Sequence, residues 1–128
     1  MFKLDIIIPV YNEDEKIVDL INQLKEGINH KFRILICFDE DNDKTLQYLK
    51  NNKLVNDEVV LVKNTSNGPN SAIIEGIKNS SSEIILVYMA DDFENIKIIN
   101  KMIAYMDEGF DLIIPSRFIK GGKMIGAK

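Results

Sequence analysis

Short apolar runs alternate along the chain with longer segments in which apolar residues recur at helical spacing. The runs are rich in Ile and Val and mostly lack polar alternation, which is typical of strands buried on both faces. Their starts lie about 25 to 28 residues apart, an interval typical of repeated strand–helix units. The pattern therefore predicts five strands, over 4–10, 32–38, 58–63, 83–88 and 111–116.

The intervening segments predict amphipathic helices. The longest stripe occupies positions i, i+3, i+4, i+7 and i+11 and consists of Ile17, Leu20, Ile21, Leu24 and Ile28. Shorter stripes lie within 45–49, 72–77 and 99–106. Such stripes are expected to face a core. Alternating strands and helices predict an α/β fold with an open, mainly parallel sheet and helices on both faces.

Length and composition indicate one globular domain over residues 1–128, with 45% hydrophobic and 28% charged residues. The net charge of −4 argues against a general nucleic-acid binder. No apolar run approaches the roughly 20 residues that span a bilayer. We therefore expect a cytoplasmic domain, or one at the inner membrane face through a longer parent chain. We also expect the chain to end partway through a larger domain, with 116–128 as a loop.

Cys37 is the only cysteine of the chain and lies within an apolar run. A thiol in such a run is expected to be buried in the core. With one Cys and one His in the sequence, a zinc site of the usual ligand set is excluded.

Polar residues gather directly after each predicted strand. In an open α/β sheet, ligands bind outside the carboxyl ends of the strands, so these residues are expected to share one rim. In strand order they are Pro9, Tyr11 and Glu13; Asp39, Asp41 and Asp43; Asn67, Gly68 and Asn70; Asp91 and Asp92; and Ser116 and Arg117. The sequence thus predicts one ligand site at this rim.

Each of these residues also has a purely structural interpretation, because Asn, Asp and Ser cap helices at about 1 kcal/mol each. Arg117 can be a solvated surface charge. The candidate caps, helix by helix, are Asn12 or Asp14; Asp41 or Asp43; Asn67, Asn70 or Ser71; and Asp92 or Asn95. The sequence leaves both interpretations open.

Two other functions are weighed against the rim. A calcium loop would need Gly and Glu at its sixth and twelfth positions, but the loop that begins at Asp39 has Lys44 and Lys50 there. A receiver-type signalling domain would need an acidic pair after the first strand and an Asp after the third. Those places hold "PVYNE" and "VKNTS", so this remains a weaker alternative.

Four motifs together resemble the family 2 glycosyltransferases, which have a GT-A fold. They are "IIIPVYNEDEKI" (6–17), "ILICFDEDNDKT" (34–45), "NGPNSAIIEGIKNSSSEIILVYMADD" (67–92) and "IIPSRFIKGG" (113–122). The last resembles the dolichol- or polyprenyl-phosphate sugar synthase branch. The resemblance covers nearly the whole chain and implies the Rossmann-like, nucleotide-binding half of a GT-A fold.

The chain departs from the family pattern at four places, one of which is Asp92, where Leu is common. Phe38 stands where the family often has the first Asp of an acidic pair, so Asp39 matches the second. Met89 stands where the first Asp of a D-x-D motif is usual, so Asp91 matches the second. A Lys common before the third helix is replaced around Pro69.

The resemblance implies transfer of a sugar, with inversion, from a nucleotide-diphosphate sugar of the UDP or GDP type. The acceptor would be a polyprenyl phosphate or a glycan, and Mg²⁺ or Mn²⁺ would neutralise the diphosphate. Asp91 would be the primary metal ligand and Asp92 a second ligand or a cap. The other implied roles are Asp39 for the base or ribose; Pro9, Tyr11 and Glu13 for the nucleoside pocket; Gly68 for close approach of an anion; and Arg117 for a phosphate. A non-catalytic nucleotide-binding domain is the alternative from another class.

Overall fold

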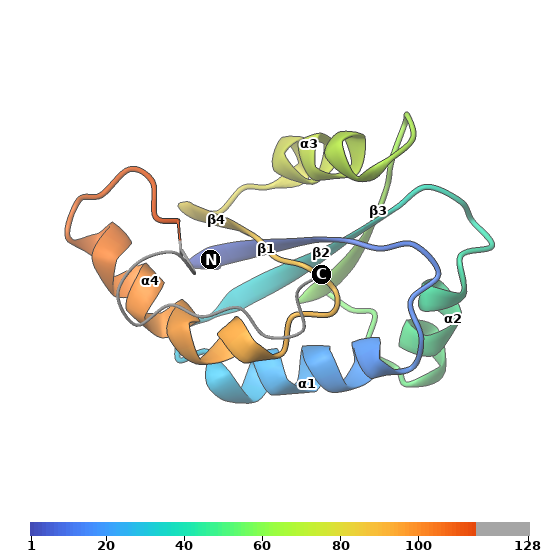
Figure 1. The fold of residues 1–128 in the computed structure, drawn as a ribbon, viewed down its shortest axis with the longest axis horizontal. Coiled ribbons are helices and arrows are strands. Elements are labelled where there is room, and N and C mark those ends of the chain that lie inside the picture. Colours follow the sequence, from blue (N-terminus) through green and yellow to red (C-terminus); the bar gives the residue numbers. More distant parts are fainter. Residues whose placement is uncertain (115–128) are drawn as a thin grey trace, which may run out of the picture.

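The computed structural model describes residues 1–114, and these form a three-layer α/β domain (Figure 1). Its four strands are β1 (Leu4–Pro9), β2 (Phe32–Phe38), β3 (Val59–Lys63) and β4 (Ile84–Val87). The helices are α1 (Lys16–Gly27), α2 (Lys44–Asn51), α3 (Pro69–Asn79), the 3₁₀ helix η1 (Glu94–Ile98) and α4 (Ile99–Asp107). All strand pairs are parallel. Because α3 covers one face of the sheet and α1, α2 and α4 the other (Figure 1), the predicted fold class is confirmed.

The strand order, β3-β2-β1-β4, decides between two doubly wound folds. It is the order of dinucleotide-binding sheets, whereas in receiver-type sheets β3 lies directly beside β1. Here β2 and β4 are the neighbours of β1. The receiver alternative is therefore wrong for this chain. The chain reverses its direction of travel across the sheet between β1 and β4, which makes that position the topological switch point.

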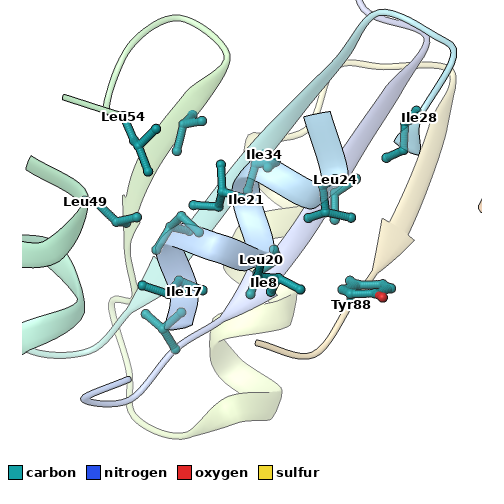
Figure 2. Packing of buried hydrophobic residues seen from close by; sticks show 14 of the residues in the cluster. Ile8, Ile17, Leu20, Ile21, Leu24, Ile28, Ile34, Leu49, Leu54 and Tyr88 are labelled. Atoms are coloured by element: carbon teal, nitrogen blue, oxygen red, sulfur yellow. The ribbon is translucent and has the colours of Figure 1, made fainter. Parts of the chain in front are cut away.

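The larger core cluster lies between the sheet and α1. Leu20 and Leu24 are fully buried against sheet residues that include Ile8 and Ile34 (Figure 2). All five residues of the predicted stripe are buried, and the most exposed of them, Ile28, has only 6% of its surface exposed. The helical period that predicts this helix therefore also identifies the side chains that hold it to the sheet.

A smaller core cluster joins α3 to the opposite face through Ile7, Leu35, Cys37 and neighbouring side chains. A Cβ at Gly76 would lie 2.6 Å from Cγ2 of Ile7 and 2.9 Å from Sγ of Cys37, so only glycine allows α3 to approach so closely. The prediction of a buried Cys37 thiol is confirmed. Burial, with a contribution from the Glu75 charge, raises the pKa of this thiol to about 12, so it stays protonated and unreactive.

The structure corrects two strand predictions. Ile85 and Val87 of β4 are each 42% exposed, because β4 lies at the sheet edge while α3 packs on β1, β2 and β3. Residues 111–114 do not form the predicted fifth strand, and Leu112 and Ile114 are 74% and 73% exposed. Apolar, β-branched runs favour strands only where a half-buried surface receives them, and nothing in the described part of the sheet buries these two. Residues 115 and 116 lie outside the described range.

The helices of this domain are short. The longest, α1, has 12 residues, which corresponds to about 18 Å at the usual rise per residue. Within residues 1–114, no helix combines the length and the apolar character that a membrane span requires.

Candidate functional site at the carboxyl edge of the sheet

A cleft of about 310 Å³ opens at the carboxyl edge of the sheet, at the switch point between β1 and β4. This is where open α/β sheets bind their ligands. A smaller apolar hollow of about 80 Å³ lies between β4 and α4 and offers little to orient a polar ligand. The walls of the larger cleft carry charges of both signs and include Asn12, Glu13 and Asp14 after β1, Lys44 at the start of α2, and Ala90 and Asp91 after β4.

The loop after β1 leaves the sheet at Pro9 and turns sharply. Tyr11 projects from it with 72% of its surface exposed, and its amide donates to Oε2 of Glu13 at 2.9 Å. Asn12 has a left-handed backbone with φ of 47°, a conformation that Asn tolerates better than most residues. The turn directs Tyr11 and Glu13 to the rim, where a ligand can reach both.

The three aspartates of the loop after β2 have three different tasks. Asp39 is half-buried and accepts from Asn64 Nδ2 at 2.8 Å. Asp41 pairs with Lys63 at 2.9 Å on the surface. Asp43 is 3% exposed and caps α2 by accepting from the Thr45 amide at 2.8 Å. Because they do not converge on one point, the rejection of a calcium loop is consistent with their geometry.

Asp39 joins the end of β2 to the loop before α3. Its second oxygen accepts from the amide of Gly68 at 3.0 Å. Gly68 has a φ of 95° and ψ of 163°, a region open essentially to glycine alone. Asn64, only 4% exposed, links the same two segments, because its main-chain amide donates to the carbonyl of Phe38 at 2.8 Å. The site therefore has a rigid floor formed by Asp39, Asn64 and Gly68.

The adjacent carboxylates after β4 differ in their surroundings. Asp92 accepts from the amide of Asn95 at 3.0 Å and from Nδ2 of Asn95 at 2.7 Å, and these bonds stabilise the turn that leads into η1. The main-chain carbonyl of Asp92 accepts from the hydroxyl of Tyr88. Burial, followed by the nearby Asp92 charge, raises the pKa of this tyrosine, so it stays neutral and able to donate. Asp91 is exposed at the cleft, and a ligand can therefore reach its carboxylate.

The donor set at this rim suits a divalent ion only when a ligand supplies further oxygens. Residues 1–114 contain no cluster of three or more His, Cys, Asp or Glu side chains placed to hold a metal. Mg²⁺ characteristically uses one or two carboxylates together with phosphate oxygens. A single accessible carboxylate such as Asp91 fits that pattern, with a diphosphate as the second partner.

The structure brings most of the predicted site residues to one edge. Glu13 and Asp91 share the cleft. Asp39 and Gly68, in the loops that follow β2 and β3, are hydrogen-bonded to each other. Arg117 lies outside the described residues. The predicted ligand roles of these side chains remain predictions.

The structure also tests the predicted helix caps. Asp43 caps α2, as the capping interpretation expects. The expected cap of α4 by Asp92 or Asn95 is wrong, because Ile98 occupies that N-cap position and no side chain caps the helix. The expected cap of α1 by Asn12 or Asp14 is wrong, because Glu15 occupies the N-cap position without a side-chain cap bond, although Asp14 accepts from the Lys16 amide at 2.9 Å. The expected Asn or Ser cap of α3 is wrong, because Gly68 occupies that position and no side chain caps the helix.

Three residues of the site gave no functional signal in the sequence. Asn64 follows β3 directly, and a polar residue at a strand end could have indicated it. Thr45 begins the stripe predicted within 45–49 and is completely buried, as a stripe residue should be. Its hydroxyl, however, accepts from the Glu13 amide at 2.8 Å. Lys44 lines the cleft, and its amide donates to Oδ1 of Asn12 at 3.1 Å.

A parallel sheet of this order, with an acidic and polar rim at its switch point, is the arrangement found in nucleotide-binding α/β domains. The model of glycosyl transferase family 2 matches residues 5–125. The chain therefore belongs to that family, and the resemblance of its motifs is confirmed.

Two proteins with known names or structures extend this comparison. A dolichol-phosphate mannosyltransferase from Pyrococcus furiosus is 30% identical over 125 residues, which is 95% of this chain and 35% of the relative. The crystal structure of S. aureus TarS 1-349 in complex with UDP-GlcNAc matches with a TM-score of 0.63 and 26% identity, over 83% of this chain and 31% of that chain. The chain thus spans about a third of the length of each.

Proposed function

We propose that this chain is the donor-binding part of a glycosyltransferase that uses a nucleotide-diphosphate sugar of the UDP or GDP type. The observation that carries the proposal is the convergence of Glu13 and Asp91 on one polar cleft at the switch point of the sheet. Asp39 and Gly68 complete the rim on the β2 side. The TarS structure that resembles this chain holds UDP-GlcNAc, which supports a donor of this class.

Each rim residue has a role that follows from its chemistry. The exposed ring of Tyr11 and the side chain of Glu13 line the nucleoside pocket. Pro9 shapes it from its buried position at the end of β1, and Asp39 accepts hydrogen bonds from the base or ribose. Gly68, at the N-terminus of α3, lets an anion approach main-chain amides. Arg117, which lies outside the described residues, is proposed for a phosphate because its planar fork matches phosphate oxygens.

Asp91 is proposed to hold a Mg²⁺ or Mn²⁺ ion together with the diphosphate. When bound, the ion stabilises the negative charge that develops on the departing diphosphate. Asp91 carries this role because it is exposed and lines the cleft, whereas Asp92 holds Asn95 and is not among the residues that line the cleft. The ion would also relieve the repulsion between two adjacent carboxylates.

The proposed acceptor is a lipid phosphate of the polyprenyl type or a glycan hydroxyl, and in-line attack opposite the diphosphate inverts the sugar carbon. The dolichol-phosphate mannosyltransferase relative favours the phosphate. A phosphate oxygen is already anionic and needs little help from a base, whereas a hydroxyl needs a general base.

Calorimetry with UDP and with GDP, each with and without Mn²⁺, tests the proposal. We expect Mn²⁺-dependent binding of one nucleotide, weakened at least about tenfold by Asp91→Asn, because loss of groups in a metal shell typically costs this much or more. The matched control is Asp57→Asn, which changes an exposed carboxylate in the loop before β3. Equal affinity for Asp91→Asn and wild type would contradict the metal assignment, and no binding by wild type would contradict nucleotide recognition.

A second candidate is a domain that binds the nucleotide without transferring the sugar. It is supported by Met89 at the position of the usual first Asp. A radiolabelled donor separates the two. Release or transfer of the labelled sugar favours the enzyme, and binding without turnover favours the second candidate.

A further inference from the structure

The loop between β1 and α1 is hydrogen-bonded to the N-terminal end of α2. The amide of Asn12 donates to both carboxylate oxygens of Asp43, at 3.0 and 3.1 Å. The amide of Glu13 donates to Oγ1 of Thr45 at 2.8 Å. In the opposite direction, Oδ1 of Asn12 accepts from the amide of Lys44 at 3.1 Å. The two elements, more than 30 residues apart in sequence, are therefore hydrogen-bonded in both directions.

The two acceptors that α2 contributes to this network, Asp43 and Thr45, are among the few buried polar side chains of the domain. Asp43 is 3% exposed and Thr45 is 0% exposed. Hydrogen bonds away from water are strong, and a group left unpaired there is costly. The network also fixes Asn12 in its left-handed conformation, with φ of 47°, which sets the direction in which the chain leaves β1.

An ordinary helix cap does not require this arrangement. Capping of α2 is already satisfied by the bond from the Thr45 amide to Asp43. The additional bonds from Asn12 and Glu13 act on a different element, and that element carries Tyr11 and Glu13 to the rim. Tyr11 is too exposed for packing to fix it, so its position depends on the hydrogen-bonded residues that follow it.

We infer that Asp43 and Thr45 are positioning residues for the nucleotide site. They act through the amides of Asn12 and Glu13 and hold the rim loop in its binding conformation before the ligand arrives. This inference rests on the proposed function, which it deepens by naming the buried groups that preorganise the donor pocket. Preorganisation raises affinity because the bound conformation need not be ordered during binding.

The test compares two substitutions at position 45. Thr45→Val keeps the shape of the side chain and removes the hydroxyl acceptor, whereas Thr45→Ser keeps the hydroxyl. We expect Thr45→Val to weaken UDP or GDP binding about five- to tenfold, the effect of one unmade hydrogen bond. Thr45→Ser is expected to stay within about twofold of wild type, because the acceptor remains. Asp43→Asn serves as a second variant, since an amide cannot accept through both of its terminal atoms.

A second measurement makes the result independent of any ligand. We expect the amides of Asn12 and Glu13 to exchange with solvent about tenfold faster in Thr45→Val, because local opening governs such exchange. The matched control for a merely structural role is Asp5→Asn, which changes a buried carboxylate at the other end of β1. It is expected to lower stability while nucleotide affinity and the exchange rates of these two loop amides stay near wild type.

The outcomes separate the two claims. Wild-type affinity and wild-type exchange in both Thr45→Val and Asp43→Asn would overturn the inference. Equal loss of affinity in Asp5→Asn and Thr45→Val would also overturn it, because a general loss of stability would then explain both. If wild type binds neither UDP nor GDP, the proposed function fails, and faster exchange in Thr45→Val alone still supports the positioning role.

Discussion

The two ends of the parallel sheet each bury a carboxylate, but they surround it differently. At the amino end, Asp5 is 0% exposed and accepts from Nε and Nη2 of Arg33 at 3.0 and 2.9 Å. It also accepts from the hydroxyl of Ser80 at 2.7 Å and from the amides of Ser81 and Ser82 at 2.9 and 3.2 Å. At the carboxyl end, Asp43 accepts from main-chain amides only, beside an open cleft.

Under the proposed function, this difference separates the groups that stabilise the sheet from the groups that bind the ligand. At the amino end the Arg33 guanidinium neutralises the buried charge, and the turn between α3 and β4 closes over it. At the carboxyl end the polar groups hold loops in place while the carboxylate of Asp91 stays exposed. We therefore expect substitutions at the amino end to change the free energy of unfolding, and substitutions at the carboxyl end to change ligand affinity.

The largest expected effect on stability comes from Asp5→Asn. Loss of one partner of a buried ion pair typically costs about 3 to 5 kcal/mol. We expect a cost near the lower end of this range, because 18% of the Arg33 side chain is exposed and its charge can reach water. Urea denaturation at pH 7 measures the change in the free energy of unfolding. Asp57→Asn, an exposed change, should stay within about 0.5 kcal/mol of wild type, and a similar loss in both variants would contradict the comparison.

Acid should remove the same stabilisation gradually. Burial alone would raise the pKa of the Asp5 carboxyl, but the Arg33 guanidinium and the donors of Ser80, Ser81 and Ser82 hold it well below its usual range. The carboxylate therefore stabilises the fold at pH values above its unfolded pKa of about 3.9. This contribution is lost as the pH falls from there through the lower folded pKa.

Urea midpoints at a series of pH values from neutral to strongly acidic follow that loss. The advantage of wild type over Asp5→Asn should be constant near neutral pH and shrink below about pH 4. An advantage that instead grows on acidification would show that the Asp5 carboxylate is not the stabilising species.

The smallest expected effects come from two glycines that share a positive φ but lie at different places in the fold. Gly68 and Gly109 have φ values of 95° and 102°, and neither has an atom within 4 Å of the place that a Cβ would take. Alanine at either position should cost about 1 to 2 kcal/mol through backbone strain. Only Gly68→Ala should also weaken nucleotide binding, by about fivefold, because the Gly68 amide is bound to Asp39 at the rim. Calorimetry beside urea denaturation would detect equal losses of affinity, which would refute the distinction.

Local patterns in the sequence predicted most of the layers of this fold. The period of Ile17, Leu20 and Leu24 predicts α1 and its buried face, because amphipathicity is a property of consecutive residues. The strand ends predict the rim, because parallel strands place their carboxyl ends on one edge. Strand order was not predictable in this way, and the exposure of Ile85 and Val87 follows from that order.

The networks that distinguish the two ends of the sheet were hidden for a related reason. Asp5 binds Arg33, 28 residues away, and Ser81, 76 residues away, and no local pattern connects such positions. Thr45 looked like one more member of a helical stripe, although its hydroxyl serves the loop of Glu13. The family motifs point to Asp39 and Asp91 as candidate site residues. The side chains that position the loop after β1 can be recognised only in the folded chain.

Paramagnetic broadening by Mn²⁺ in the presence of UDP or GDP tests the central claim most directly, because it maps the ion onto individual amides. The account predicts that signals of residues 11–13 and 90–93 broaden when nucleotide and Mn²⁺ are both present, while those of Ser80, Ser81 and Ser82 stay sharp. Asp91→Asn should remove most of the effect, and Asp57→Asn should not. Broadening centred on the amino end, or unchanged by Asp91→Asn, would contradict the assignment of the carboxyl edge as the donor site.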